Sequence, residues 1–141
     1  MTSTFGEIKL CKMKSNKELD RLSRIILDSS IAVHKEVGPG LLESIYHLCL
    51  IRELQSKGVM FASSVKFPLF YKGMSLNRDF VIDILVEDEI IIELKAVEVI
   101  LPVHTAQIIS YLKVTNKRLG FLINFNSPKL IGGFRRYVNN F

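Results

Sequence analysis

The spacing of apolar residues along this chain changes from helical to strand-like at about residue 65. Two earlier stretches, from about Lys17 to Val37 and from about Leu41 to Lys57, carry apolar residues every three to four positions, which is typical of helices that bury one face. In the first, the stripe comprises Leu19, Leu22, Ile25, Ile26, Ser29, Ala32 and Val33. Gly38 and Gly58 predict the ends of the two helices, because glycine readily adopts the left-handed conformation there.

From Val65 onward the apolar residues recur with a period of two. Val65–Tyr71 predicts a strand, and Lys72-Gly73 predicts a hairpin turn into a second strand over Met74–Phe80. Asn77–Val97 then predicts two further strands joined at an acidic turn, Glu87-Asp88-Glu89. The middle of the chain is therefore expected to form β-hairpins.

One helix and one or two strands are predicted in the remaining residues. Pro102 introduces a helix from about His104 to Thr115. Its residues expected to pack inward are Ala106, Ile108, Ile109 and Leu112. The apolar run Leu119–Phe125 predicts a strand covered on both faces, and after a turn at 126–128, residues 132–138 predict an edge strand or a short helix end. We expect an α/β domain with a mixed sheet of four to five strands flanked by helices.

The central hairpin places two acids and an amine on one face. If three residues form its turn, Asp83 lies opposite Glu93, and Lys95 shares their face because side chains alternate along a strand. Val81, Leu85 and Ile91 belong to the same face. The other face is predicted to be aliphatic core: Ile82, Ile84, Val86, Ile90, Ile92 and Leu94. Two carboxylates facing one another among apolar residues are costly unless they share a cation or a proton.

This constellation suits a magnesium site for phosphodiester cleavage, since Mg²⁺ (or Mn²⁺ in its place) prefers oxygen ligands. The candidate ligands are Asp83, Glu93, the backbone carbonyl of Leu94, and Glu43 from the second predicted helix. Lys95 would orient the attacking water and balance charge in the transition state. Gln107 and Tyr111, four residues apart on one helix face, would hold the site or the scissile backbone.

A surface ion pair is the plainer interpretation of the same residues. Glu-x-Lys is frequent on exposed strands, and a pair between Lys95 and Glu93 or Asp83 would contribute about 0–1 kcal/mol. The aliphatic sequence around the acids argues against a merely solvated face.

Other polar residues are expected to be structural. His34, His47 and His104 are too dispersed to predict a metal cluster, and His104 is expected to cap a helix. Tyr46 is expected to pack in the core with its hydroxyl hydrogen-bonded. Cys11 and Cys49 are too few for a disulfide framework or a zinc site, and Cys49 is expected to be a buried thiol.

Composition and charge exclude few classes of protein. Of the 141 residues 48% are hydrophobic and 23% charged, as in soluble globular domains, and no apolar run approaches the roughly 18 residues of a membrane span. The absence of an apolar signal segment favours the cytoplasm. A net charge of +5 and a pI of about 9.3 are compatible with a polyanionic partner and equally with a solvated basic surface.

Several separated blocks resemble one family of small bacterial and archaeal proteins. Residues 40–46, GLLESIY, match the G-x-x-E-x-x-Y signature after which the family is named. Residues 34–43 are similar to its opening block, residues 91–97 and 101–113 to its middle, and residues 122–125 to its closing strand. The resemblance extends over roughly residues 22–134.

That family is placed in the PD-(D/E)xK nuclease-like superfamily, which implies a restriction-endonuclease-like core and Mg²⁺-dependent hydrolysis of nucleic acid, with DNA favoured over RNA. By this resemblance the motif residues are Asp83, Glu93 and Lys95, the upstream helical acid is Glu43, and the trailing helix motif is Gln107 with Tyr111. Ile82 stands where the PD motif has proline. A homodimer is expected by analogy.

The resemblance leaves two functions open. One is a metal-dependent nuclease, and the other is a nucleic-acid-binding or protein-interaction module that keeps the nuclease fold without turnover. For the domain organisation, we expect residues 1–16, with weak periodicity and several lysines, to be a poorly ordered basic arm, and residues 17–141 to form one domain.

Overall fold

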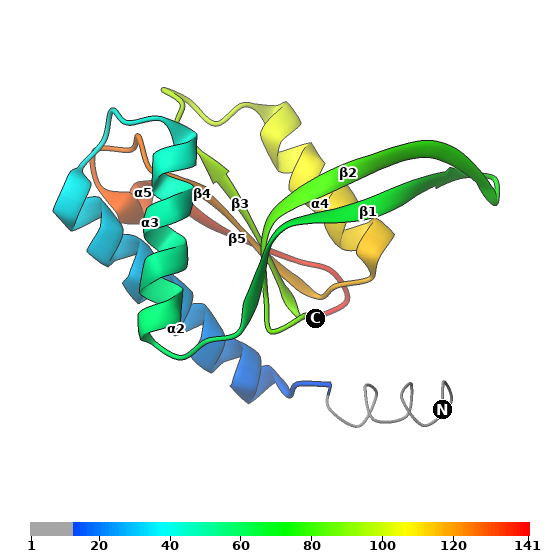
Figure 1. Cartoon of the computed structure of the whole chain (residues 1–141), viewed down its shortest axis with the longest axis horizontal. Helices are drawn as coiled ribbons and strands as arrows, with labels where there is room; N and C mark the ends of the chain where they lie inside the picture. Colours follow the sequence, from blue (N-terminus) through cyan, green and yellow to red (C-terminus); the bar gives the residue numbers. More distant parts are fainter. Residues whose placement is uncertain (1–12) are drawn as a thin grey trace.

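Five strands form one mixed sheet in the computed structural model, which describes residues 13–141, and helices cover both faces of this sheet (Figure 1). The strands are β1 (Phe61–Tyr71), β2 (Met74–Val86), β3 (Ile90–Lys95), β4 (Leu119–Asn124) and β5 (Phe134–Val138). The helices are α2 (Asn16–Val37), α3 (Glu43–Ser56), α4 (Pro102–Thr115) and α5 (Leu130–Gly133). The expected α/β architecture with a five-stranded mixed sheet is confirmed.

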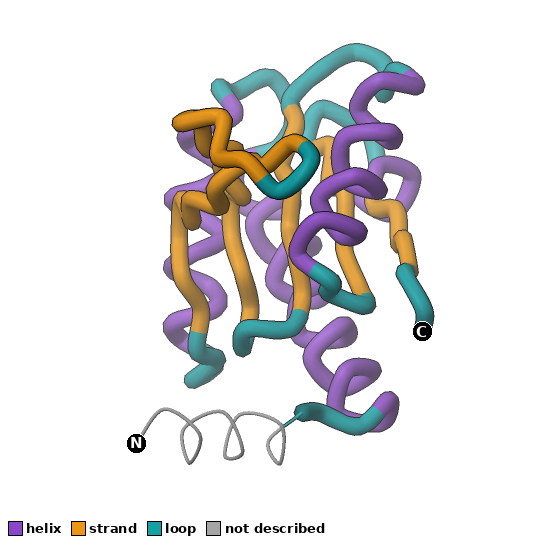
Figure 2. The backbone as a smooth tube through the Cα atoms, turned by 90° about the vertical axis from the view of Figure 1, so that its right-hand side faces the viewer, coloured by secondary structure: helices purple, strands orange, loops and turns teal. Residues whose placement is uncertain are grey.

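The strands lie in their sequence order, β1-β2-β3-β4-β5. Only β3 and β4 run parallel, joined by the crossover through α4; the other neighbouring strands are antiparallel. Figure 2 shows the strands side by side with the helices packed around them. The two strands predicted over residues 74–86 are one continuous strand, β2, because the chain makes no turn between them.

The ends of α2 follow the local sequence. Ser15 is its N-cap, and its Oγ accepts a hydrogen bond of 3.2 Å from the backbone N–H of Glu18. Gly38 ends the helix at a φ of 67°, a value that glycine adopts without strain. Of the basic arm expected over residues 1–16, Asn16 already belongs to α2, and residues 1–12 lie outside the described part of the chain.

One core lies between the sheet and the helices α2 and α3. It buries the stripe of α2 against the inward-facing aliphatic residues of β2, β3 and β4. At its centre the rings of Tyr46 and Phe125 stack 4.7 Å apart. The Tyr46 hydroxyl donates to the carbonyl of Gly38 (2.6 Å) and accepts from the N–H of Leu41 (3.1 Å), so the prediction of a buried, hydrogen-bonded tyrosine is confirmed.

A second core lies on the opposite face, under α4. It consists of Phe80, Ile82, Leu85, Ile91, Ile108, Leu112 and Leu122. Both faces of the central hairpin are therefore buried, and the expectation that only one face is core is wrong. The second core surrounds the acidic positions with apolar side chains, which explains how carboxylates on this face lose contact with water.

Helix α4 buries a narrower face than expected. Ile108 and Leu112 pack inward as predicted, but Ala106 is exposed and Ile109 is 37% exposed. These two residues lie on the side of α4 that no described element covers. Cys49 is half-buried rather than buried, and no helix within residues 13–141 is long and apolar enough to cross a membrane.

We expect Gly133→Ala to destabilise the fold, because a Cβ at Gly133 would lie 2.4 Å from the carbonyl oxygen of Asn124 and 2.9 Å from Cβ of Ser127. Overpacking of this kind costs about 1–3 kcal/mol, which urea denaturation followed by circular dichroism can measure. Gly132→Ala is the matched control, since its new Cβ would meet only the Ser127 hydroxyl, at 3.3 Å. Equal losses in the two variants would contradict the close approach at Gly133.

Candidate active site

A three-residue turn sets the register of the central hairpin. Glu87 and Asp88 adopt positive φ angles of 52° and 58°, and the strands pair as Ile84↔Ile92, Leu85↔Ile91 and Val86↔Ile90. Continuing this register places Asp83 opposite Glu93, as the sequence predicts.

The regular pairing of β2 with β3 stops at these two acids, and their side chains replace the missing backbone bonds. Oδ2 of Asp83 accepts a hydrogen bond of 2.8 Å from the N–H of Leu94. Oε1 of Glu93 accepts one of 3.4 Å from the N–H of Asp83. Each carboxylate thus accepts a hydrogen bond from a backbone N–H of the other strand. These two bonds hold the carboxyl groups beside one another.

An unusual conformation in β1 accompanies this arrangement. Ser64 has a φ of 53°, and the pairing of β1 with β2 passes from Ser63↔Ile84 to Val65↔Ile82 without a pair between them. Ile82 packs under α4 whereas Ile84 packs under α2 and α3. The prediction that both belong to one aliphatic face is therefore wrong, because the side-chain alternation of β2 is interrupted at Asp83, where a left-handed residue lies in the neighbouring strand.

Glu93 is a buried acid, with only 4% of its surface exposed. Burial raises its pKa to about 9; the charge of Asp83 and a hydrogen bond between the two side chains act in the same direction, and Lys95 acts weakly against them. At neutral pH without a cation, the pair therefore holds a proton. A carboxylate pair that retains a proton for lack of a positive charge is a suitable site for a divalent cation.

Glu43 lies near this pair although it comes from another element. It is the first residue of α3, and its pKa is raised by burial and by the charge of Asp83. Lys95, His47 and His104 lower that pKa. The charge of Lys95 also lowers the pKa of Glu93, so its ammonium group is close enough to act on both acids, although it forms no direct ion pair in the described part of the chain.

Helix α4 brings Gln107 and Tyr111 to the same region. Burial and then the charge of Glu93 raise the pKa of Tyr111, while a side-chain hydrogen bond from Gln107 lowers it. The ring of Tyr111 stacks on Phe80 of β2 at 4.5 Å, and Phe80 stacks on Phe67 of β1 at 5.5 Å. Electrostatic interactions thus connect Glu43, Asp83, Glu93, Lys95 and Tyr111, and Gln107 is connected to them through Tyr111.

Asn124 supports this region and is not among the residues predicted from the sequence. It is 5% exposed at the end of β4, and its side-chain amide accepts from the N–H of Val97 (3.1 Å) and donates to the carbonyl of the same residue (2.8 Å). The next residue, Phe125, bonds the carbonyl of Lys95 at 2.9 Å. A polar residue ending an otherwise apolar strand is the signal that could have identified it.

His47 is a second residue near the site that is not predicted from the sequence. It follows Glu43 by four positions on α3, a spacing that places two side chains on one helix face. Its Nε2 lies 2.7 Å from the hydroxyl of Ser63, next to the left-handed Ser64. His104, in contrast, accepts the N–H of Leu101 at 3.0 Å through Nδ1, so its predicted capping role is confirmed.

The described residues fit a metal through two carboxylates rather than through a ready-made cluster. Within residues 13–141 no three His, Cys, Asp or Glu side chains are close enough together to hold an ion. The available donors are the Asp83–Glu93 pair and the carbonyl of Leu94, and Mg²⁺ commonly uses only one or two carboxylates and keeps several waters. The set therefore suits Mg²⁺, and Glu43 would reach the ion through water.

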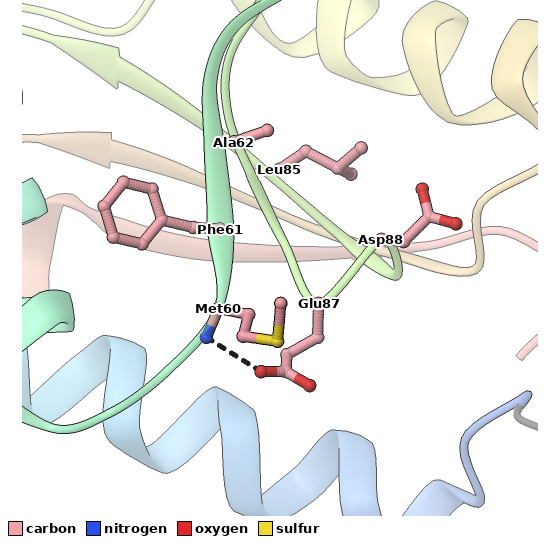
Figure 3. Close-up of a pocket in the computed structure, with 6 residues that line it drawn as sticks. All are labelled: Met60, Phe61, Ala62, Leu85, Glu87 and Asp88. Carbon is pink, nitrogen blue, oxygen red and sulfur yellow. Dashed lines mark hydrogen bonds between the residues drawn. The ribbon is translucent and has the colours of Figure 1, made fainter.

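A separate hollow of about 310 Å³ lies at the turn end of the hairpin (Figure 3). Its lining residues are Met60, Phe61, Ala62, Leu85, Glu87 and Asp88. Glu87 is already engaged there, because its carboxylate accepts the N–H of Met60 at 2.8 Å and pairs with Lys14 at 3.3 Å. None of the predicted site residues lines this hollow.

Comparison with known proteins agrees with the α/β fold. A family model described as the PD-(D/E)XK nuclease superfamily matches residues 20–137. Searches of curated proteins and of solved structures gave no match. The matched range contains β1 to β4 and all but the last residue of β5, together with Glu43, Asp83, Glu93 and Lys95. Because this match extends over most of the sequence, the chain belongs to the PD-(D/E)XK nuclease superfamily.

Proposed function

We propose that this chain is a Mg²⁺-dependent nuclease that hydrolyses phosphodiester bonds in DNA, within the GxxExxY family of the superfamily. The observation that carries the proposal is the pairing of half-buried Asp83 with buried Glu93, a pair that retains a proton and is oriented by backbone N–H groups. A pair without function would be expected to contain a basic partner or an apolar replacement, because a buried, uncompensated acid lowers stability.

Asp83, Glu93 and the carbonyl of Leu94 would hold the ion, with Glu43 as a ligand through water. When bound, Mg²⁺ supplies a positive charge at the phosphoryl oxygen and a more acidic bound water. Lys95 would hold the attacking water and balance the negative charge that grows on the phosphorus-bound oxygens. These roles need an ammonium group near the carboxylates, and they are supported by the charge of Lys95, which lowers the pKa of both Glu43 and Glu93.

Gln107 and Tyr111 would position the scissile backbone. A hydrogen bond links Gln107 to the phenol of Tyr111, and the charges of Glu93 and Asp83 act on that phenol, so both side chains of α4 are connected to the acidic region. The stack of Tyr111 on Phe80 restricts the ring, so the phenol is held without loss of further side-chain entropy on binding. Asn124 would act at a distance, by fixing the chain that follows Lys95.

We expect Asp83→Asn and Glu93→Gln each to lower the rate of DNA cleavage by at least about 100-fold, because each removes a charge that would hold the metal. Labelled plasmid and linear duplex, incubated with Mg²⁺ or Mn²⁺, measure this. Asp28→Asn is the matched control, since Asp28 is an exposed acid on α2. Cleavage that persists in both site variants would refute the site, and metal-independent binding without cleavage by the unaltered chain would indicate the non-catalytic module.

Lys95→Ala should retain metal binding and lose turnover. The lysine is expected to act on the water and the transition state, so its removal leaves the carboxylate ligands in place. Isothermal titration with Mn²⁺ measures the first property, and single-turnover cleavage at saturating Mn²⁺ measures the second. Loss of Mn²⁺ affinity in proportion to loss of rate would contradict the role assigned to Lys95.

The metal-free protein should lose stability as the pH rises. The pKa of Glu93 is about 9 when folded against 4.5 as its ordinary value, so the folded state retains a proton that the unfolded chain releases. The contribution of Glu93 to the free energy of unfolding is therefore fully present below about pH 4.5, and it is lost progressively between there and about pH 9. Urea midpoints in EDTA across this range measure it.

Glu93→Gln should flatten this pH dependence, because the neutral amide has no proton to lose. Glu98→Gln, which changes an exposed glutamate in the loop after β3, should leave it unchanged. Saturating Mn²⁺ should reverse the trend in the unaltered chain, since the ion binds the deprotonated pair. A pH dependence that is the same in the Glu93→Gln chain would show that the proton resides elsewhere.

A further inference from the structure

We propose that residues 65–81, here named the arm, form a surface that binds double-stranded DNA by entering its major groove. The proposal rests on the nuclease function above and adds the form of the substrate. The arm contains the distal halves of β1 and β2 and the turn at Lys72-Gly73.

The arm extends beyond the sheet because its two strands are longer than their neighbours. β1 has 11 residues and β2 has 13, whereas β3 and β4 have six each. Figure 1 shows the two strands curving away from the body as a ribbon, and Figure 2 shows its tip in front of the sheet. At about 3.3 Å per residue, seven residues of this ribbon extend roughly 20 Å.

The arm contains three basic residues and one acidic residue. Lys66, Lys72 and Arg78 are exposed, and no ion pair within residues 13–141 involves them. Lys72 lies 5.4 Å above the ring of Tyr71, and Asp79 is the one acid in this segment of the sequence. Three cations on a projecting ribbon are suited to contact phosphates on the strands that flank a groove.

The tip also exposes large apolar side chains. Phe70 is 61% exposed, Tyr71 62% and Met74 73%. In a major groove such side chains can contact the methyl group of thymine, so alternating apolar and basic residues match a surface of base edges between phosphates. A face meant only for a second protein would not need three unpaired cations among its apolar residues.

The dimensions of the ribbon favour duplex DNA over RNA. The backbones of two paired strands lie about 4.8 Å apart. Such a ribbon, with its side chains, fits the major groove of B-DNA, which is about 12 Å wide and admits a two-stranded ribbon. The major groove of A-form RNA is too narrow for side chains to enter. Single strands have no groove and would bind by stacking on the exposed rings.

The root of the arm is joined to the candidate active site. Phe67 and Phe80 stack on each other, and Phe80 stacks on Tyr111 of α4. Asp83 follows the last arm residue, Val81, by two positions on the same strand. A duplex held by the arm would therefore have its backbone beside the carboxylates, with little freedom to shift.

The test measures binding without cleavage. The unaltered chain in EDTA is titrated with a labelled DNA duplex of about 20 base pairs, the corresponding single strand and the corresponding RNA duplex, with fluorescence anisotropy as the readout. The arm variant combines Lys66→Gln, Lys72→Gln and Arg78→Gln. The matched control combines Lys17→Gln, Arg24→Gln and Lys35→Gln on α2, which removes the same charge from exposed positions on another face.

We expect the unaltered chain to bind the DNA duplex more tightly than the other two nucleic acids. The arm variant should raise the Kd for the duplex about tenfold or more. It should also make the negative slope of log K against log salt shallower by about 3. The control variant should change both quantities much less. Phe70→Ser with Tyr71→Ser should weaken binding with little change in the slope. Hydrolysis of bis(4-nitrophenyl) phosphate with Mn²⁺ should be the same in all variants, since that substrate is too small to reach the arm.

Equal weakening in the arm and control variants, or equal affinity for single strands and duplex, would overturn the proposal. A change in sedimentation from dimer to monomer in the arm variant would also overturn it, because the arm would then bind a second copy of the chain. Absence of any hydrolysis together with arm-dependent duplex binding would refute the nuclease function alone.

Discussion

The constraint on which the site depends is the placement of two carboxyl groups side by side in a sheet covered on both faces, with Glu93 buried and Asp83 half-buried. Glu93 has lost almost all contact with water, and burial, together with the charge of Asp83, raises its pKa to about 9. Two helices on one face and α4 on the other make this burial possible. The same layers that stabilise the sheet therefore create a position where a divalent cation would be bound in preference to a proton.

Backbone hydrogen bonds make this arrangement specific. Where β2 leaves β3, the N–H groups of Asp83 and Leu94 would lose their sheet partners, and the carboxylates accept them instead. An unpaired buried N–H costs about 1–3 kcal/mol, so the acids contribute to the fold as well as to the proposed chemistry.

Much of this could be predicted from the sequence, because it follows from periodicity and from short turns. The three-residue turn and the alternation of apolar residues place Asp83 opposite Glu93, and the near-continuous apolar run of β4 predicts burial on both faces. Long-range contacts were harder to predict. The change of side at Ile82 depends on the left-handed Ser64 in another strand, and the placement of Asn124 against Val97 depends on a crossover of 27 residues. Neither leaves a periodic signal.

The hydroxyl of Tyr46 connects the core to the start of α3. It binds the carbonyl of Gly38 and the N–H of Leu41, and so determines the path of the loop two residues before Glu43. Tyr46 itself is anchored by its ring against Phe125, at the end of β4. Gly38, Glu43 and Tyr46 are consequently coupled in position: a buried aromatic ring determines the direction from which the acid approaches the Asp83–Glu93 pair.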